Sequence, residues 1–204
     1  MKKAGIIIES LILMTALQAV KLAIEAVVRP YLPAAVFIYK MTTACIMVML
    51  AVVVYVYARL RKTPLCVLPV PFGGRYIIFT CIAAALLISS PSNYTGGCQP
   101  LLLAVYGSII TPVYEELLFR GYLWSRFNTV LSRELYTYLW SIALFTLWHC
   151  GYMTRQIISG DWNAVLWKLA AGVGYGAVLG LVRLKTKNCY STVLVHGVLN
   201  IFMI

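Results

Sequence analysis

The chain has 204 residues, of which 62% are hydrophobic and only 11% are charged, and its mean hydropathy is +0.86. About a quarter of the residues of an ordinary soluble domain are charged, so this composition excludes a soluble globular protein and indicates a chain embedded in a bilayer. The net charge of +11 would suggest nucleic acid as a partner in a soluble protein, but no basic helix stands outside the apolar stretches, and we exclude that partner.

Seven apolar stretches approach or exceed the length of about 20 residues that a helix needs to cross a bilayer. They lie at about residues 5–28, 33–58, 75–91, 101–125, 136–154, 162–184 and 190–204. Prolines and glycines separate them, and no hydrophilic linker marks a domain boundary. We therefore predict an all-α fold, a polytopic transmembrane helical bundle of about seven spans.

The basic residues of the loops gather on one side of this predicted bundle. They precede the first stretch or follow the second, fourth and sixth: Lys2, Lys3, Arg59, Arg61, Lys62, Arg75, Arg126, Arg133, Arg183, Lys185 and Lys187. The loops of the other side contain only Arg29 and Arg155. Because cytoplasmic loops of membrane proteins are enriched in Lys and Arg, we predict a cytoplasmic N-terminus.

The fourth stretch contains two adjacent carboxylates, Glu115 and Glu116, within an apolar helix. Glu116 and Arg120 are four residues apart, a spacing at which an acid and a base pair on one helical face. Glu115 points elsewhere, so another helix or water must satisfy it, and Pro112 removes a backbone hydrogen bond that could let the helix kink and admit water. Ionisable residues inside membrane spans are costly and usually functional. We regard Glu115 as a candidate general base, and an interfacial charge cluster is the alternative.

The fifth stretch ends in a histidine, in the sequence Phe145-Thr-Leu-Trp-His149. If the fourth and fifth stretches form an antiparallel pair that turns near Ser132, His149 lies at the same depth in the membrane as Glu115. A lone histidine here could also be an ordinary packing residue.

The last two stretches contain a glycine repeat and a polar pair. Gly172, Gly176 and Gly180 recur every four residues in the sixth stretch, without the order or the preceding strand of a dinucleotide site, so we predict a helix-packing face. In the seventh stretch His196 and Asn200 are four residues apart and share a helical face, and Gly197 beside them allows a neighbouring helix to approach closely.

Together these groups supply what hydrolysis of an amide by water requires. A base takes a proton from the water, a neighbour holds the water and later protonates the leaving amine, and a donor stabilises the oxyanion. A Ser or Cys nucleophile fits less well, because no Ser-His-Asp set assembles and Cys150 would point away from His149 on a helix.

The three motifs, EExxxR, FxxxH and HxxxN, resemble those of the CPBP family of intramembrane glutamic proteases. Its members are type II CAAX prenyl endopeptidases and bacteriocin-processing or self-immunity proteins. The resemblance implies a catalytic transmembrane core at residues 101–204, preceded by variable transmembrane helices at residues 1–100. The catalytic residues that it implies are Glu115, His149, His196 and Asn200, with Glu116 and Arg120 as a supporting ion pair. Glu115 and His149 would activate the water, and His196 and Asn200 would bind the oxyanion.

We therefore expect a cell-membrane endopeptidase without a cofactor, which cleaves a membrane-associated or lipidated peptide and has membrane lipid as its other partner. We also expect its site to open toward the cytoplasmic half, near the basic loops. Two alternatives stay open. One is a zinc-dependent protease, because two histidines and a glutamate can bind zinc, although HExxH is missing. The other is a non-catalytic protein of bacteriocin self-immunity or a scaffold.

Overall fold

The computed structural model describes residues 2–89 and 97–202, and 85% of these residues are helical, without a strand among them. Four helical runs in that part are long and apolar enough to cross a membrane: Lys3–Tyr31, Val36–Leu60, Cys98–Asn128 and Trp162–Thr186. Shorter helices occupy the other predicted stretches: α3 (Gly74–Ser89), α7 (Glu134–Trp148) and α10 (Cys189–Ile201). The all-α, multi-pass membrane fold is confirmed, whereas the number of spans and the side of the N-terminus stay predictions.

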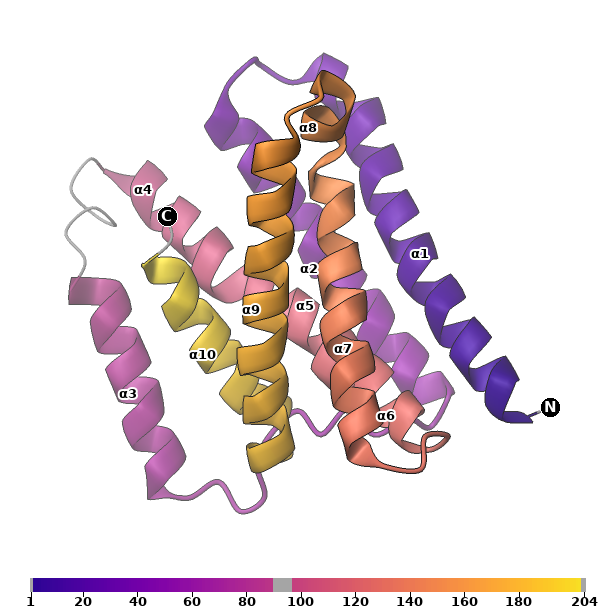
Figure 1. Ribbon diagram of the computed structural model, residues 1–204. Coiled ribbons are helices and arrows are strands. Elements are labelled where there is room, and N and C mark those ends of the chain that lie inside the picture. The colour runs from indigo at the N-terminus through magenta and orange to yellow at the C-terminus, as the bar shows by residue number, and fades with distance from the viewer. Residues whose placement is uncertain (1, 90–96, 203–204) are drawn as a thin grey trace.

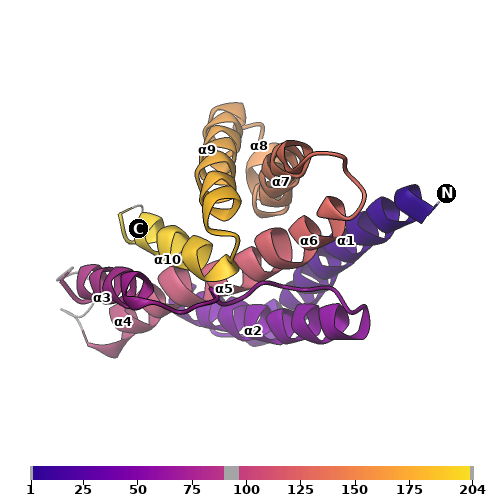
Figure 2. The same cartoon turned by 90° about the horizontal axis from the view of Figure 1, so that it is seen from below.

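The helices form layers around a central run at residues 98–128. α1 (Lys2–Val28) and α2 (Val36–Leu60) are antiparallel neighbours, and α2 packs on one side of this run. α7 and α10 pack on its other side, and α9 (Trp162–Thr186) lies against both of them, as Figure 2 shows. The short helix α8 (Thr154–Ser159) connects α7 to α9 at the top of the bundle (Figure 1).

The central run alternates between α and π winding. It consists of α4 (Cys98–Val105), the π segment η3 (Tyr106–Ile110), α5 (Thr111–Glu116), the π segment η4 (Leu117–Leu123) and α6 (Trp124–Asn128). Pro112, which has no backbone N–H to donate, lies at the start of α5. π segments are rare and are frequently found at functional sites, and here they flank the two adjacent glutamates.

α9 packs on α7 through its glycines. A Cβ atom at Gly172 would lie 3.3 Å from the Cα atom of Thr146, and one at Gly176 would lie 3.2 Å from the Cα atom of Ile142. Side chains at these positions would push the two helices apart. The predicted glycine packing face is therefore confirmed, and the turn expected near Ser132 falls between the end of α6 and the start of α7.

α3 forms a loosely packed edge of the bundle. It lies against α10 and has no buried residue. Its N-terminal half is attached by side-chain hydrogen bonds, in which Thr80 pairs with the hydroxyl of Tyr190 at 2.5 Å and Nδ2 of Asn188 donates to the hydroxyl of Tyr76 at 3.2 Å.

Candidate active site

A cavity of about 380 Å³ inside the bundle is lined by all four residues predicted to be catalytic: Glu115, His149, His196 and Asn200. They come from α5, from the end of α7 and from α10, which are far apart in the sequence. The rest of the wall consists of Met47, Tyr106, Thr111, Lys168, Ala171, Gly172 and Tyr175. Glu115 is 2% exposed and His196 is 3% exposed, whereas His149 is half-buried and Lys168 is exposed, so the cavity joins a buried interior to the surface. Their catalytic roles stay a prediction.

Glu116 and Arg120 lie beneath this cavity as a fully buried ion pair. Nη1 of Arg120 is 3.1 Å from Oε1 of Glu116, as the four-residue spacing predicts. Nη2 of Arg120 donates to the backbone carbonyl of Gly176 at 3.3 Å, and the guanidinium lies 4.3 Å from the ring centroid of Phe145. A buried charge is stable only when its partners are retained, so this pair fixes α5 and η4 against α7 and α9.

The same glutamate orients His196. Nδ1 of His196 lies 2.9 Å from Oε1 of Glu116. Because a carboxylate oxygen only accepts hydrogen bonds, Nδ1 carries a proton, and Nε2 is the nitrogen left for water or substrate. Nε2 accepts in the neutral imidazole and donates only in the imidazolium. The predicted binding of an oxyanion by His196 therefore requires its imidazolium form.

His149 is held by the backbone of its own helix. Its Nδ1 lies 2.7 Å from the carbonyl oxygen of Phe145, one turn earlier. A carbonyl only accepts, so Nδ1 carries the proton and Nε2 carries the lone pair. This tautomer can take a proton from water. The ring of Phe145 also contacts both imidazoles, with centroids 4.7 Å from His149 and 6.1 Å from His196.

Asn200 is fixed at both ends of its amide. Nδ2 donates to the carbonyl oxygen of Gly107 at 2.7 Å, and Oδ1 accepts from the hydroxyl of Tyr175 at 3.2 Å. An amide nitrogen has two N–H groups, so one remains for a substrate. α10 comes this close to η3 because of Gly197, where a Cβ atom would collide with the carbonyl oxygen of Ser108. The predicted close approach at Gly197 is confirmed.

The model of the family described as "Type II CAAX prenyl endopeptidase Rce1-like" matches residues 97–202, which contain all three motifs. The chain belongs to this Rce1-like family. It is also similar to UPF0177 protein YxdF of Lactococcus lactis subsp. lactis (strain IL1403), with 28% identity over 133 residues that cover 62% of this chain and 66% of that protein. No solved structure matches the chain. Family membership identifies a membrane protein of a peptidase family, as the motifs predict.

Two polar residues that the sixth stretch contributes to the cavity wall, Lys168 and Tyr175, are absent from the sequence prediction. Tyr175 lies among the glycines of the sixth stretch. Because that stretch was interpreted only as a helix-packing face, Tyr175 was not considered as a site residue. The signal for Tyr175 is a hydroxyl group between residues that are otherwise small or apolar. Lys168 is a cation within the same stretch, and an ionisable residue inside a span is reason enough to expect function.

The cavity lined by Glu115 lies in the half of the bundle away from the basic loops, whereas the sequence predicted a site near them. His149 and Asn200 lie at the C-terminal ends of α7 and α10, whereas Arg133 and Lys187 precede the N-terminal ends of these helices. Figure 1 shows the loops that precede α3, α7 and α10 at the bottom and α8 at the top. The expected closeness to the basic loops was wrong because it rested on Arg120 and Arg126, which follow Glu115 along a helix that runs toward the basic end. The side of the membrane on which these loops lie stays a prediction.

The zinc set considered from the sequence joins Glu115 with the two histidines. Across residues 2–89 and 97–202, no three His, Cys, Asp or Glu side chains are grouped closely enough to hold a metal ion. These three residues share a cavity wall without forming such a group.

Proposed function

We propose that this Rce1-like protein is an intramembrane endopeptidase of the cell membrane, which hydrolyses a peptide bond of a membrane-associated or lipidated peptide. The observation that carries the proposal is the shared cavity, into which three separate helical segments bring Glu115, His149, His196 and Asn200. Each ionisable group inside a membrane costs free energy. Their assembly around one cavity favours chemistry over a purely structural role.

In the proposed reaction, Glu115 and Nε2 of His149 hold a water molecule and take its proton. The water oxygen attacks the carbonyl carbon of the scissile bond, and the carbonyl oxygen becomes an oxyanion. The remaining N–H of Asn200 and the imidazolium of His196 donate to that oxyanion. The proton then passes to the leaving nitrogen, the C–N bond breaks, and a carboxyl group and an amine result.

Three further residues contribute to the proposed reaction by holding its catalytic side chains in position. Glu116 and Arg120 hold His196 in place, and Tyr175 holds the amide of Asn200. We assign them as positioning residues, because their hydrogen bonds go to other side chains of the site.

The test is Glu115→Gln, which retains the shape of the side chain and removes the base. We expect the rate of peptide cleavage to fall about 10²–10⁴-fold, and uncut substrate to accumulate when cell peptides of wild type and variant are compared by mass spectrometry. Glu134→Gln is the matched control, because it makes the same change at the start of α7. If the Glu115→Gln protein folds and its biological function is unchanged, a non-catalytic immunity or scaffolding role replaces the protease.

We propose that the protein groups activate the water without a metal. Activity that survives prolonged treatment with a strong chelator supports this proposal. Loss of activity that added zinc restores would establish a zinc protease instead.

We also propose that the basic loops are cytoplasmic and that the cavity opens toward the exterior. Cys66 precedes α3 at the basic end and Cys98 begins α4 at the other end, and both are exposed. In variants that retain one of these two as the sole cysteine, an impermeant maleimide should label Cys98 on intact cells and Cys66 only after permeabilisation. The reverse pattern would turn the cavity toward the cytoplasm.

A further inference from the structure

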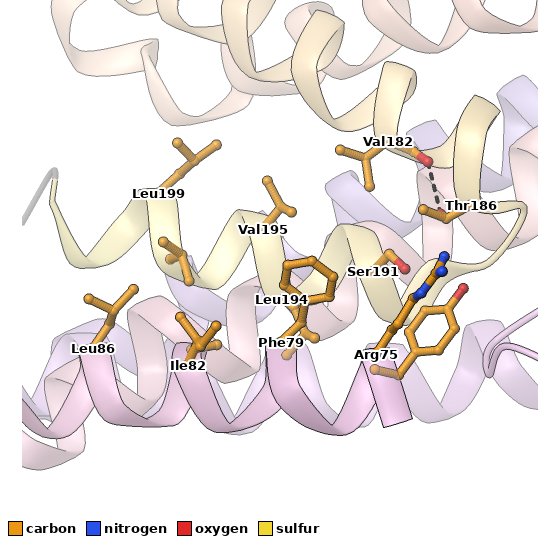
Figure 3. Close-up of a pocket in the computed structure, with 13 residues that line it drawn as sticks. Arg75, Phe79, Ile82, Leu86, Val182, Thr186, Ser191, Leu194, Val195 and Leu199 are labelled. Atoms are coloured by element: carbon orange, nitrogen blue, oxygen red, sulfur yellow. Dashed lines mark hydrogen bonds between the residues drawn. The ribbon is translucent and has the colours of Figure 1, made fainter. Parts of the chain in front are cut away.

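A second and larger cavity, of about 560 Å³, lies between α3, α10 and the end of α9 (Figure 3). It shares no wall residue with the candidate active site. Most of its wall is aliphatic or aromatic, with Phe79, Ile82 and Leu86 from α3 facing Leu194 and Leu199 from α10. The loosely packed edge at α3 is therefore a groove bounded by two helices.

Polar groups of the groove gather at one end. Figure 3 shows Arg75 there with Thr186 and Ser191, whereas Leu86 and Leu199 lie at the other end. Arg75 is exposed, and among the described residues it forms no ion pair. It is the second residue of α3, so the positive end of the helix dipole adds to its charge. This end of the groove attracts an anion.

The length of the groove matches one leaflet of a bilayer. A rise of about 1.5 Å per residue places Leu86 about 16 Å along α3 from Arg75. The hydrocarbon core of a bilayer is about 30 Å thick, so this distance corresponds to about half of it. A hydrocarbon chain that starts at Arg75 would end near the middle of the membrane.

We propose that this groove binds one anionic phospholipid, with its phosphate at Arg75 and an acyl chain between α3 and α10. The charge of Arg75, the length of the groove and its location in the bundle all favour this lipid. Arg75 belongs to the end of the bundle where the basic loops gather, and the cytoplasmic leaflet is the one that carries negative surface potential. A zwitterionic lipid also has a phosphate, but its own cation offsets that charge, so its attraction to the guanidinium is weaker. The proposal does not depend on catalysis.

The test measures lipid binding to the purified full-length protein by native mass spectrometry. Phosphatidylglycerol and phosphatidylcholine with identical acyl chains are titrated in parallel. We expect wild type to bind phosphatidylglycerol about fivefold more tightly, which is the contribution of one basic residue near an anionic surface. Arg75→Gln should abolish this preference. Arg133→Gln, which removes an exposed cation at the same end but outside the groove, should retain it.

A second variant tests the place of the acyl chain. Ala83 lines the groove, so Ala83→Phe should abolish tight binding of both lipids. Equal binding of the two lipids by wild type, or a preference that persists in Arg75→Gln, would overturn the proposal. So would binding of free glycerol 3-phosphate as tight as that of the lipid, which would indicate a phosphate site. Displacement of phosphatidylglycerol by a prenylated peptide would assign the groove to the substrate.

Discussion

The two faces of α10 contact very different surroundings. On one face His196 and Asn200 are held by hydrogen bonds to Glu116, Gly107 and Tyr175. The other face presents aliphatic side chains to a groove in which α3 has no buried residue. Hydrogen bonds have a direction and a length, so the polar face allows one arrangement of its neighbours. Apolar contacts lack that direction, so a hydrocarbon chain can take the place of side chains.

The adjacent residues Glu115 and Glu116 also differ in their surroundings. Glu116 belongs to a closed network in which Arg120 and His196 share its Oε1 atom. Glu115, the residue before it, lines the cavity instead. One carboxylate stabilises the fold and the other faces the space where a substrate would bind. Four pairs of substitutions test this division and related contrasts within the bundle.

The largest effect is expected from Glu116→Gln. The variant leaves the fully buried guanidinium of Arg120 without its negative partner, and breaking a buried pair costs about 3–5 kcal/mol. Thermal unfolding in detergent should show a large decrease in stability. Glu115→Gln is the control and should unfold near wild type. Similar unfolding of both variants would contradict the division between the two carboxylates.

Replacing a leucine by alanine should reduce stability more at the centre of the bundle than at the α3 edge. Leu118 in η4 is 0% exposed, so Leu118→Ala should cost about 2–5 kcal/mol. Leu86→Ala at the α3 groove should cost about 0.5 kcal/mol or less, as at a surface position. Both values come from unfolding in the same detergent. An equal loss would show that α3 is packed as tightly as the centre.

The glycine face of α9 offers a comparison within one helix. Gly176→Ala places a methyl group 3.2 Å from the Cα atom of Ile142 and should cost about 1–3 kcal/mol. Gly174→Ala meets no atom within 4 Å and should stabilise α9 by up to about 1 kcal/mol, because alanine favours a helix. A loss of stability in the Gly174 variant would place the packing face elsewhere.

The smallest effect is expected from Tyr175→Phe, which removes the hydrogen bond to Oδ1 of Asn200. A hydrogen bond of this kind contributes about 0.5–1.5 kcal/mol, so kcat should fall roughly two- to tenfold while KM changes little. Tyr138→Phe, which loses a bond to the carbonyl of Ala177 outside the cavity, is the control. A rise in KM with unchanged kcat would instead assign Tyr175 to substrate binding.

Hydropathy and charge predict much of this fold, because unpaired backbone groups and unpaired charges cost free energy inside a membrane. Apolar runs had to become helices, and the ionisable residues within them had to meet partners, so Glu116, Arg120 and the glycine face of α9 were predictable. The half of the bundle that contains the cavity could also have been read from the sequence, since the fifth stretch ends in His149 and Asn200 lies near the end of the seventh. It was predicted wrongly because Arg120 and Arg126 were used instead. Tyr175 was missed because a tyrosine in a span is neither apolar nor charged enough to stand out.

The π winding of the central run has a consequence for how this protein tolerates insertions and deletions. Each π turn contains an extra residue compared with an α turn, and the helix accommodates this residue without forming a loop. Removing one residue from η3 would return that turn to α geometry and leave the helical segments on either side close to their present orientation, because the extra residue is accommodated within the turn. The residues of the turn, Tyr106 among them, would change their places on the cavity wall, while the two carboxylates kept theirs. A one-residue deletion within Tyr106–Ile110 would thus reshape one side of the cavity and spare Glu115 and Glu116.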